Sequence, residues 1–166
     1  MGIAAIELCR HVIRPTLVYL DRQNPCAELL LLGIAASQSA LGAELDSCHG
    51  HGLYSIPELR HRHIWDNYLA LDPDLASRVR GLASQHAFLS SPHLELTVNL
   101  RYSTAIAWLM IEAHRLSLPT EDDPWAMAQI WQTVFQPQGQ IKDFIDAWNT
   151  CVAPPSLPGL NICSDK

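Results

Sequence analysis

Apolar residues recur at three- and four-residue spacing along most of the chain, which is the pattern of amphipathic helices. The clearest helix is predicted from Pro25 to about Ser39, where Asn24 is a suitable N-cap and a proline occupies the first helical position. This segment contains the run LLLLGIAAS, which is apolar on nearly every side of a helix. We therefore expect it to be the buried central helix of the fold.

The other periodic segments predict further helices. They span residues 3–13, 16–20, 58–71, 75–88, 91–116, 124–134 and 141–151. In the longest of them, the expected core positions are Leu96, Leu100, Ile106 and Leu109. No convincing pair of strands is present, so the predicted fold class is all-α, either without strands or with a minimal β-hairpin near residues 45–56.

The chain divides into one predicted domain and a terminal arm. Its length of 166 residues suits a single domain with a full hydrophobic core, which we place at residues 1–152. Residues 153–166 are rich in proline and yet include Leu157, Leu160 and Ile162. Because exposed apolar residues tend to be buried by a partner, we expect this arm to pack, extended, on its own domain or on a neighbouring subunit.

The charge distribution narrows the classes of partner. The formal net charge is −6, and the short basic segment from Arg60 to His63 is too small to be a nucleic-acid footprint. We therefore predict no nucleic-acid partner. The bacterial cell wall is also anionic, so an acidic protein is not the expected form of an enzyme that diffuses freely over it.

Cysteine usage and the N-terminus indicate where the chain folds. The five cysteines are odd in number, scattered and without CxxC spacing, which favours reduced thiols in a cytoplasm; they are Cys9, Cys26, Cys48, Cys151 and Cys163. The N-terminus has no charged or apolar region typical of a signal peptide. The longest apolar run, residues 27–36, contains Glu28 and is too short to cross a bilayer. We expect folding in a cytoplasm and no membrane insertion.

Residues 29–65 contain the candidate chemistry. The predicted central helix ends in Gln38-Ser39, and the segment GLYSIP, residues 52–57, follows about fifteen residues later. Enzymes that cleave glycosidic bonds need a carboxylic acid that protonates the leaving oxygen. A position at the end of a buried apolar helix would raise the pKa of such an acid through desolvation.

This layout resembles the lysozyme-like fold of soluble-type lytic transglycosylases, and more narrowly a set of phage-encoded lysozyme-like proteins. The segments that carry the resemblance are CRHVIRPTL, LLLLGIAASQS, GLYSIPELRHRHIWDNYLAL, LASRVRGLASQ and HLELTVNLRYSTAIA. In that family the helix ends in a catalytic Glu followed by Ser, and a Gly-Leu-aromatic-Gln-Ile segment builds the substrate cleft. The resemblance implies a single lysozyme-like domain whose cleft is formed by Ser39, Gly52, Leu53, Tyr54 and Ser55.

Two positions depart from the family pattern. Gln38 stands where the catalytic Glu is expected, and Ser55 stands where Gln follows the aromatic residue. An amide has no proton to donate at neutral pH, and the loss of general acid catalysis costs ~10²–10⁴-fold in rate. We therefore assign no catalytic residue. Two alternatives stay open: Gln38 is an ordinary polar residue at a helix end, or a nearby carboxylate (Glu44, Asp46 or Glu58) replaces the acid.

Histidines and one cysteine in the same region suggest a zinc hypothesis. His49 and His51 could converge on a metal with Cys48. However, His61 and His63 lie two residues apart on a predicted helix and so do not face the same way. No CxxC or HExxH pattern anchors a site, and our prediction contains neither a metal nor another cofactor.

Three functions follow from these patterns. The first is a structural protein of a bacteriophage virion (tail, baseplate or internal component) built on an inactive lysozyme-like scaffold; it would be present in the host cytoplasm during assembly and then in the virion. The second is an active virion-associated peptidoglycan hydrolase or lytic transglycosylase. The third is a non-catalytic module that binds cell-wall glycan. The expected partners are other virion proteins in the first case and peptidoglycan glycan strands in the other two.

Overall fold

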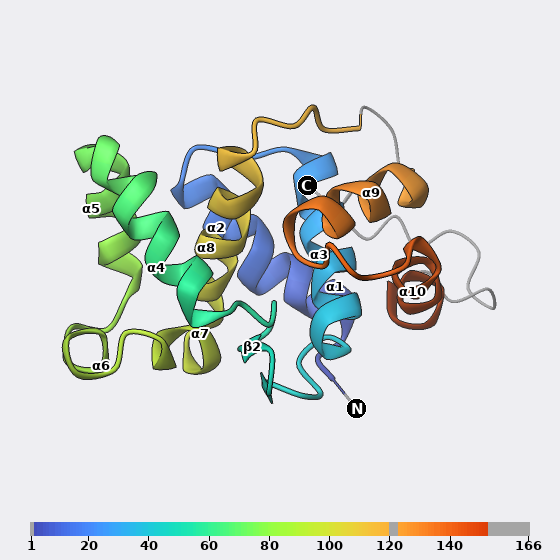
Figure 1. Cartoon of the computed structure of the whole chain (residues 1–166), viewed down its shortest axis with the longest axis horizontal. Helices are drawn as coiled ribbons and strands as arrows, with labels where there is room; N and C mark the ends of the chain where they lie inside the picture. The colour runs from blue at the N-terminus through green and yellow to red at the C-terminus, as the bar shows by residue number, and fades with distance from the viewer. Residues whose placement is uncertain (1, 120–122, 153–166) are drawn as a thin grey trace.

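The computed structural model describes residues 2–119 and 123–152, which form an assembly of helices with one short hairpin (Figure 1). It contains 68% helix and 3% strand, which confirms the all-α prediction with a minimal β-hairpin. The helical elements are α1 (Ala5–Leu8), η1 (Cys9–Ile13), α2 (Arg14–Tyr19), α3 (Pro25–Ser39), α4 (Glu58–Asn67), η2 (Leu69–Leu71), α5 (Pro73–Leu82), α6 (Gln85–Ser90), α7 (Leu94–Val98), α8 (Leu100–Ala113), α9 (Pro124–Val134), α10 (Ile141–Ala147) and η3 (Trp148–Val152). The strands β1 (Asp46–Ser47) and β2 (Gly50–His51) pair antiparallel.

Helix α3 lies at the centre, as its apolar sequence predicts. Its start is fixed by Asn24, whose side-chain oxygen accepts the backbone N–H groups of Cys26 and Ala27. Helices α8, α9 and α10 pack around it, and all of them contribute to one cluster of buried apolar side chains. At Gly33, a Cβ atom would lie 2.5 Å from Cζ of Phe144, so α10 approaches α3 closely because this position has no side chain.

One charged residue is buried on this apolar helix. Glu28 is 2% exposed, and its carboxylate accepts a hydrogen bond of 3.1 Å from Nε of Arg14 on α2. A buried carboxylate without a partner would be strongly destabilising, so this ion pair satisfies the charge and fixes the register of α2 against α3.

Three predicted helices are divided in the structure. The segment 58–71 becomes α4 and η2, the segment 75–88 becomes α5 and α6, and the segment 91–116 becomes α7 and α8. The break between α7 and α8 is at Asn99, whose backbone is extended while its side-chain oxygen accepts the N–H of Tyr102. Of the expected core positions, Leu96, Ile106 and Leu109 are fully buried, whereas Leu100 is only partly buried.

The described residues contain no helix that is both long enough and apolar enough to cross a membrane. The predicted arm, residues 153–166, lies outside the described residues.

Candidate functional site

The side chain of Gln38 joins three parts of the fold. It lies in the last turn of α3, and its Nε2 donates a hydrogen bond of 3.0 Å to the backbone oxygen of Tyr54. Its Oε1 accepts hydrogen bonds from Nε1 of Trp131 (3.2 Å) and Nε2 of Gln136 (3.3 Å). Both ends of the amide are therefore engaged, and the side chain links α3 to the segment before α4 and to the end of α9.

Ser39 connects the same helix to the same segment. Its Oγ lies 2.6 Å from the backbone oxygen of Leu53 and accepts the N–H of Gly42. Gln38 and Ser39 thus bind two consecutive carbonyl groups, those of Tyr54 and Leu53. The sequence-predicted site residues Gln38, Ser39, Leu53 and Tyr54 do come together, through backbone contacts of the 53–54 segment.

The side chains of that segment point into the core. Leu53 and Tyr54 are both 0% exposed, and the Tyr54 hydroxyl lies 2.9 Å from Oγ1 of Thr104 on α8. Burial raises the pKa of the Tyr54 phenol. The Tyr54 ring is therefore a core side chain rather than the open cleft wall that the family resemblance implied.

Two residues beside them have the left-handed backbone conformation. Gly52 has a φ of +79°, and a Cβ there would lie 1.7 Å from the backbone oxygen of Leu96, so only glycine fits. Ser55 has a φ of +49°, and its Oγ lies 3.1 Å from Oγ of Ser47 on β1. This segment is a tight turn packed against the hairpin and against α7.

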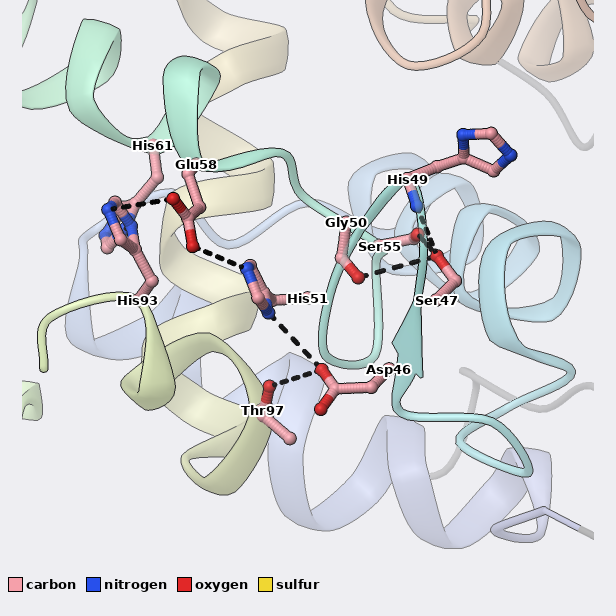
Figure 2. Close-up of polar contacts among 10 residues, drawn as sticks. All are labelled: Asp46, Ser47, His49, Gly50, His51, Ser55, Glu58, His61, His93 and Thr97. Carbon is pink, nitrogen blue, oxygen red and sulfur yellow. Dashed lines mark hydrogen bonds and ion pairs between the residues drawn. The ribbon is translucent and has the colours of Figure 1, made fainter.

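Glu44 and Glu58, two of the carboxylates proposed as substitute acids, have different surroundings. Glu44 is exposed in the loop after α3. Glu58 is also exposed, but its Oε1 lies 3.1 Å from Nε2 of His51 and its Oε2 lies 4.0 Å from Nε2 of His93 (Figure 2). Of the two, Glu58 is the one placed beside groups that can exchange protons.

Glu58 belongs to a continuous chain of titratable groups, which we call the histidine–carboxylate cluster: Asp46, His51, Glu58, His61 and His93. Nδ1 of His51 lies 3.3 Å from Oδ1 of Asp46, which also accepts a hydrogen bond from Thr97 (Figure 2). Nδ1 of His93 lies 2.9 Å from Nδ1 of His61. The cluster thereby connects the hairpin, α4 and the turn before α7.

The inner end of the cluster is buried. His61 is 1% exposed, and its Nε2 lies 2.6 Å from the hydroxyl of Tyr102 on α8. Burial, together with the nearby His93 and His51, lowers the pKa of His61 to about 4. Burial also lowers the pKa of His93, against the opposing effect of Glu58. Both imidazoles are therefore neutral at pH 7.

The zinc hypothesis gains no support from the geometry. The described residues contain no group of three or more His, Cys, Asp or Glu side chains that could hold a metal ion. Cys48 and His49 are exposed in the hairpin, and His49 points away from His51 (Figure 2). His61 is buried whereas His63 is exposed, as their spacing on a helix predicts.

A surface groove lies elsewhere. It has a volume of about 500 Å³ and runs between α4 and α8, where it is lined by Leu59, Arg60, His63, Ile64, Met110, Ala113 and His114. None of the sequence-predicted cleft residues lines it. Leu59 is 75% exposed at this groove.

Some of the contacts described above join residues that are far apart in the sequence, so no local sequence pattern predicts them. His93 lies 32 positions from His61, and Trp131 lies 93 positions from Gln38. Such pairs are formed by tertiary packing, so a reading of local spacing does not find them.

No protein-family model matches the chain, and no curated protein or solved structure is significantly similar to it.

Proposed function

We propose that this protein is a structural component of a bacteriophage particle, built on a lysozyme-like scaffold that does not cleave peptidoglycan. The observation that carries the proposal is the use of Gln38 as a structural bridge. All three of its hydrogen bonds suit an amide, which donates at one end and accepts at the other.

The chemistry of this position supports a non-catalytic role. A general acid must present its proton to the substrate, so it must not spend that proton on the protein's own backbone. The donor end of Gln38 is bound to the Tyr54 carbonyl, and the Tyr54 ring is buried rather than turned toward a cleft. The position thus contributes to packing between α3 and α9.

The phage assignment rests on the resemblance of five segments between residues 9 and 107 to phage-encoded lysozyme-like proteins. The partners we propose are other virion proteins of the tail, the baseplate or the interior of the particle. The formal net charge of −6 agrees with a protein that does not diffuse freely over an anionic cell wall and reaches it as part of a particle.

The test has two parts. Purified full-length protein is incubated with peptidoglycan sacculi, and soluble muropeptides are quantified; we expect none above the buffer control. In parallel, purified particles of the encoding phage are analysed by quantitative mass spectrometry, and we expect the chain at a fixed copy number. Cleavage by the wild-type protein, or its absence from particles, would contradict the proposal.

A second candidate function is favoured by the surroundings of Glu58. This exposed carboxylate lies between His51 and His93, which could move protons to and from it. In that case the protein would be a peptidoglycan-cleaving virion enzyme with a displaced acid.

The second candidate is separated from the first by two matched variants. If Glu58 is the acid, Glu58→Gln abolishes muropeptide release, whereas Glu44→Gln, which removes another exposed carboxylate, leaves it unchanged. Our primary proposal predicts no release from the wild type or from either variant.

A further inference from the structure

The surface groove between α4 and α8, which we call the α4–α8 groove, has an apolar floor. Ile64 and Met110 line it and are almost fully buried, with exposed fractions of 4% and 3%, whereas Leu59 lies exposed at its rim. Its volume is about 500 Å³. Clefts of roughly 300–1,000 Å³ that combine apolar side chains with a few polar groups are the usual form of small-molecule sites. The size and the floor of this groove therefore suit the apolar body of a small molecule.

The polar groups of the α4–α8 groove are cationic or neutral. Its lining includes Arg60, His63 and His114 and contains no aspartate or glutamate. This lining contrasts with the whole chain, which has 17 acidic residues against 11 lysines and arginines. Glu58 of α4 lies on the other side of that helix, where it belongs to the histidine–carboxylate cluster. An anionic group is therefore the polar partner that the charges at this groove favour.

The α4 wall of the groove presents hydrogen-bond donors. Nη1 of Arg60 donates to the backbone oxygen of Val134 at the end of α9, and this contact restricts where the guanidinium lies. Nδ1 of His63 lies 2.9 Å from Nδ2 of Asn67. An amide nitrogen can only donate, so Nδ1 of His63 accepts and its Nε2 carries the proton. Because Arg60 and His63 are three residues apart on one helix face, a single anionic group can contact both.

The α8 wall presents an acceptor instead. Nδ1 of His114 lies 2.9 Å from the backbone oxygen of Met110. A carbonyl oxygen can only accept, so Nδ1 of His114 donates, and Nε2 of the neutral ring keeps a lone pair. The two walls are thus complementary to a ligand with an anionic group at one edge and a hydroxyl or amide donor at the other.

We propose that the α4–α8 groove is a binding site for a small amphipathic carboxylate with an aromatic or acyl body. The carboxylate contacts Arg60 and His63, and the apolar body lies on Ile64 and Met110. A protein partner is less well matched, because a stable protein interface uses roughly 20–30 residues a side, whereas seven residues line this groove. This inference goes beyond the proposed function and does not rest on it.

The experiment is an NMR titration of the full-length chain at pH 7.5, in which backbone amide shifts are followed as sodium 3-phenylpropanoate is added. We expect saturable shifts centred on α4 and the end of α8, with a Kd of about 1 mM, as suits a ligand of this size. The matched probe is 3-phenylpropanamide, which has the same body without the charge. It should bind about tenfold more weakly, because it lacks the charged hydrogen bonds to the α4 wall.

Two variants locate the anionic group. Arg60→Gln should weaken the binding of 3-phenylpropanoate about tenfold and leave that of the amide unchanged. Arg62→Gln is the matched control, because Arg62 is exposed on α4, does not line the groove and carries the same charge. Its Kd for 3-phenylpropanoate should stay within about twofold of the wild-type value, since solvent and salt screen a charge outside the groove.

Four results would overturn the proposal: no saturable shifts, shifts of similar size over the whole surface, equal affinity for the carboxylate and the amide, or equal losses in Arg60→Gln and Arg62→Gln. Shifts of the groove residues on dilution of the ligand-free chain would also overturn it, because they would show that a second copy occupies the groove. If Arg60→Gln does not fold, the wild type still decides, since a ratio near one between its affinities for the two probes refutes the proposal.

Discussion

At the scale of single residues, Gln38 shows how a polar side chain can serve packing at a position where the family resemblance implies catalysis. Its amide donates to a backbone carbonyl and accepts from two side chains of the α9 region. A carboxylate of the same shape has no donor when it is ionised, so one of its oxygens would face the Tyr54 carbonyl oxygen without a proton between them.

We predict that Gln38→Glu destabilises the fold by about 1–3 kcal/mol at pH 8, the usual cost of leaving a half-buried acceptor unsatisfied. Repulsion from the Tyr54 carbonyl should raise the pKa of the new carboxyl in the folded state. The difference from wild type should therefore be small near the ordinary glutamate pKa of about 4.3 and grow as the pH rises.

Urea unfolding at pH 5 and pH 8 measures this difference. Gln129→Glu provides the control, because Gln129 is exposed on α9 and the variant introduces the same charge. A Gln38→Glu protein as stable as wild type at pH 8 would show that the bridge contributes little.

At the scale of elements, local sequence signals located most helices and failed where tertiary contacts interrupt them. Helix α3 begins at Pro25 and α9 spans Pro124–Val134, as predicted from their caps and prolines. The segment 91–116 has helical periodicity throughout, yet it breaks at Asn99. The side chain of Asn99 binds Tyr102 N, the Leu82 carbonyl and Glu95, and two of these partners lie outside its own helix.

The same limit applies to the candidate site. The sequence predicted that Gln38 and Ser39 would meet the 52–55 segment, because the motif spans few residues. It did not predict the partner of His61, because three helical elements (η2, α5 and α6) lie between α4 and His93. It also did not predict the partners of Gln38 on α9 and just after it. It also placed Tyr54 in a cleft, whereas tertiary packing buries the ring against Thr104.

Asn99→Ala should lower the free energy of unfolding by about 1–3 kcal/mol, because it removes a helix cap and the hydrogen bonds to the Leu82 carbonyl and to the buried carboxylate of Glu95. The far-ultraviolet circular dichroism of the folded protein should change little. Asn149→Ala, at an exposed position, should stay within about 0.5 kcal/mol of wild type. Equal stability of the two variants would mean that the break at Asn99 is set by something other than its side chain.

At the scale of the whole molecule, the buried His61 makes stability depend on pH. Its pKa is about 4 in the fold and about 6.5 in an unfolded chain. Between these values the unfolded state binds a proton that the folded state excludes. The free energy of unfolding therefore falls as the pH decreases from 6.5 to 4, and it is insensitive to His61 above pH 6.5.

The expected loss attributable to His61 over this range is up to about 3 kcal/mol, since each unit of pKa shift corresponds to about 1.4 kcal/mol. Chemical denaturation at pH 7, 6 and 5 measures it. His61→Gln should flatten this dependence, whereas His63→Gln, at an exposed position on the same helix, should not. If the free energy of unfolding of His61→Gln fell with decreasing pH as steeply as that of the wild type, the acid sensitivity would belong to other groups.

The bonding of Gln38 also has a consequence for ancestry. If this chain descends from an enzyme with an acid at that position, as the proposed function implies, the surrounding residues have since become fitted to the amide. Trp131 and Gln136 donate to its oxygen, and the Tyr54 carbonyl accepts from its nitrogen. Restoring the acid by one codon change would then lower stability before any activity returned. The loss of catalysis would in effect be irreversible, because each step back toward the enzyme would first be selected against.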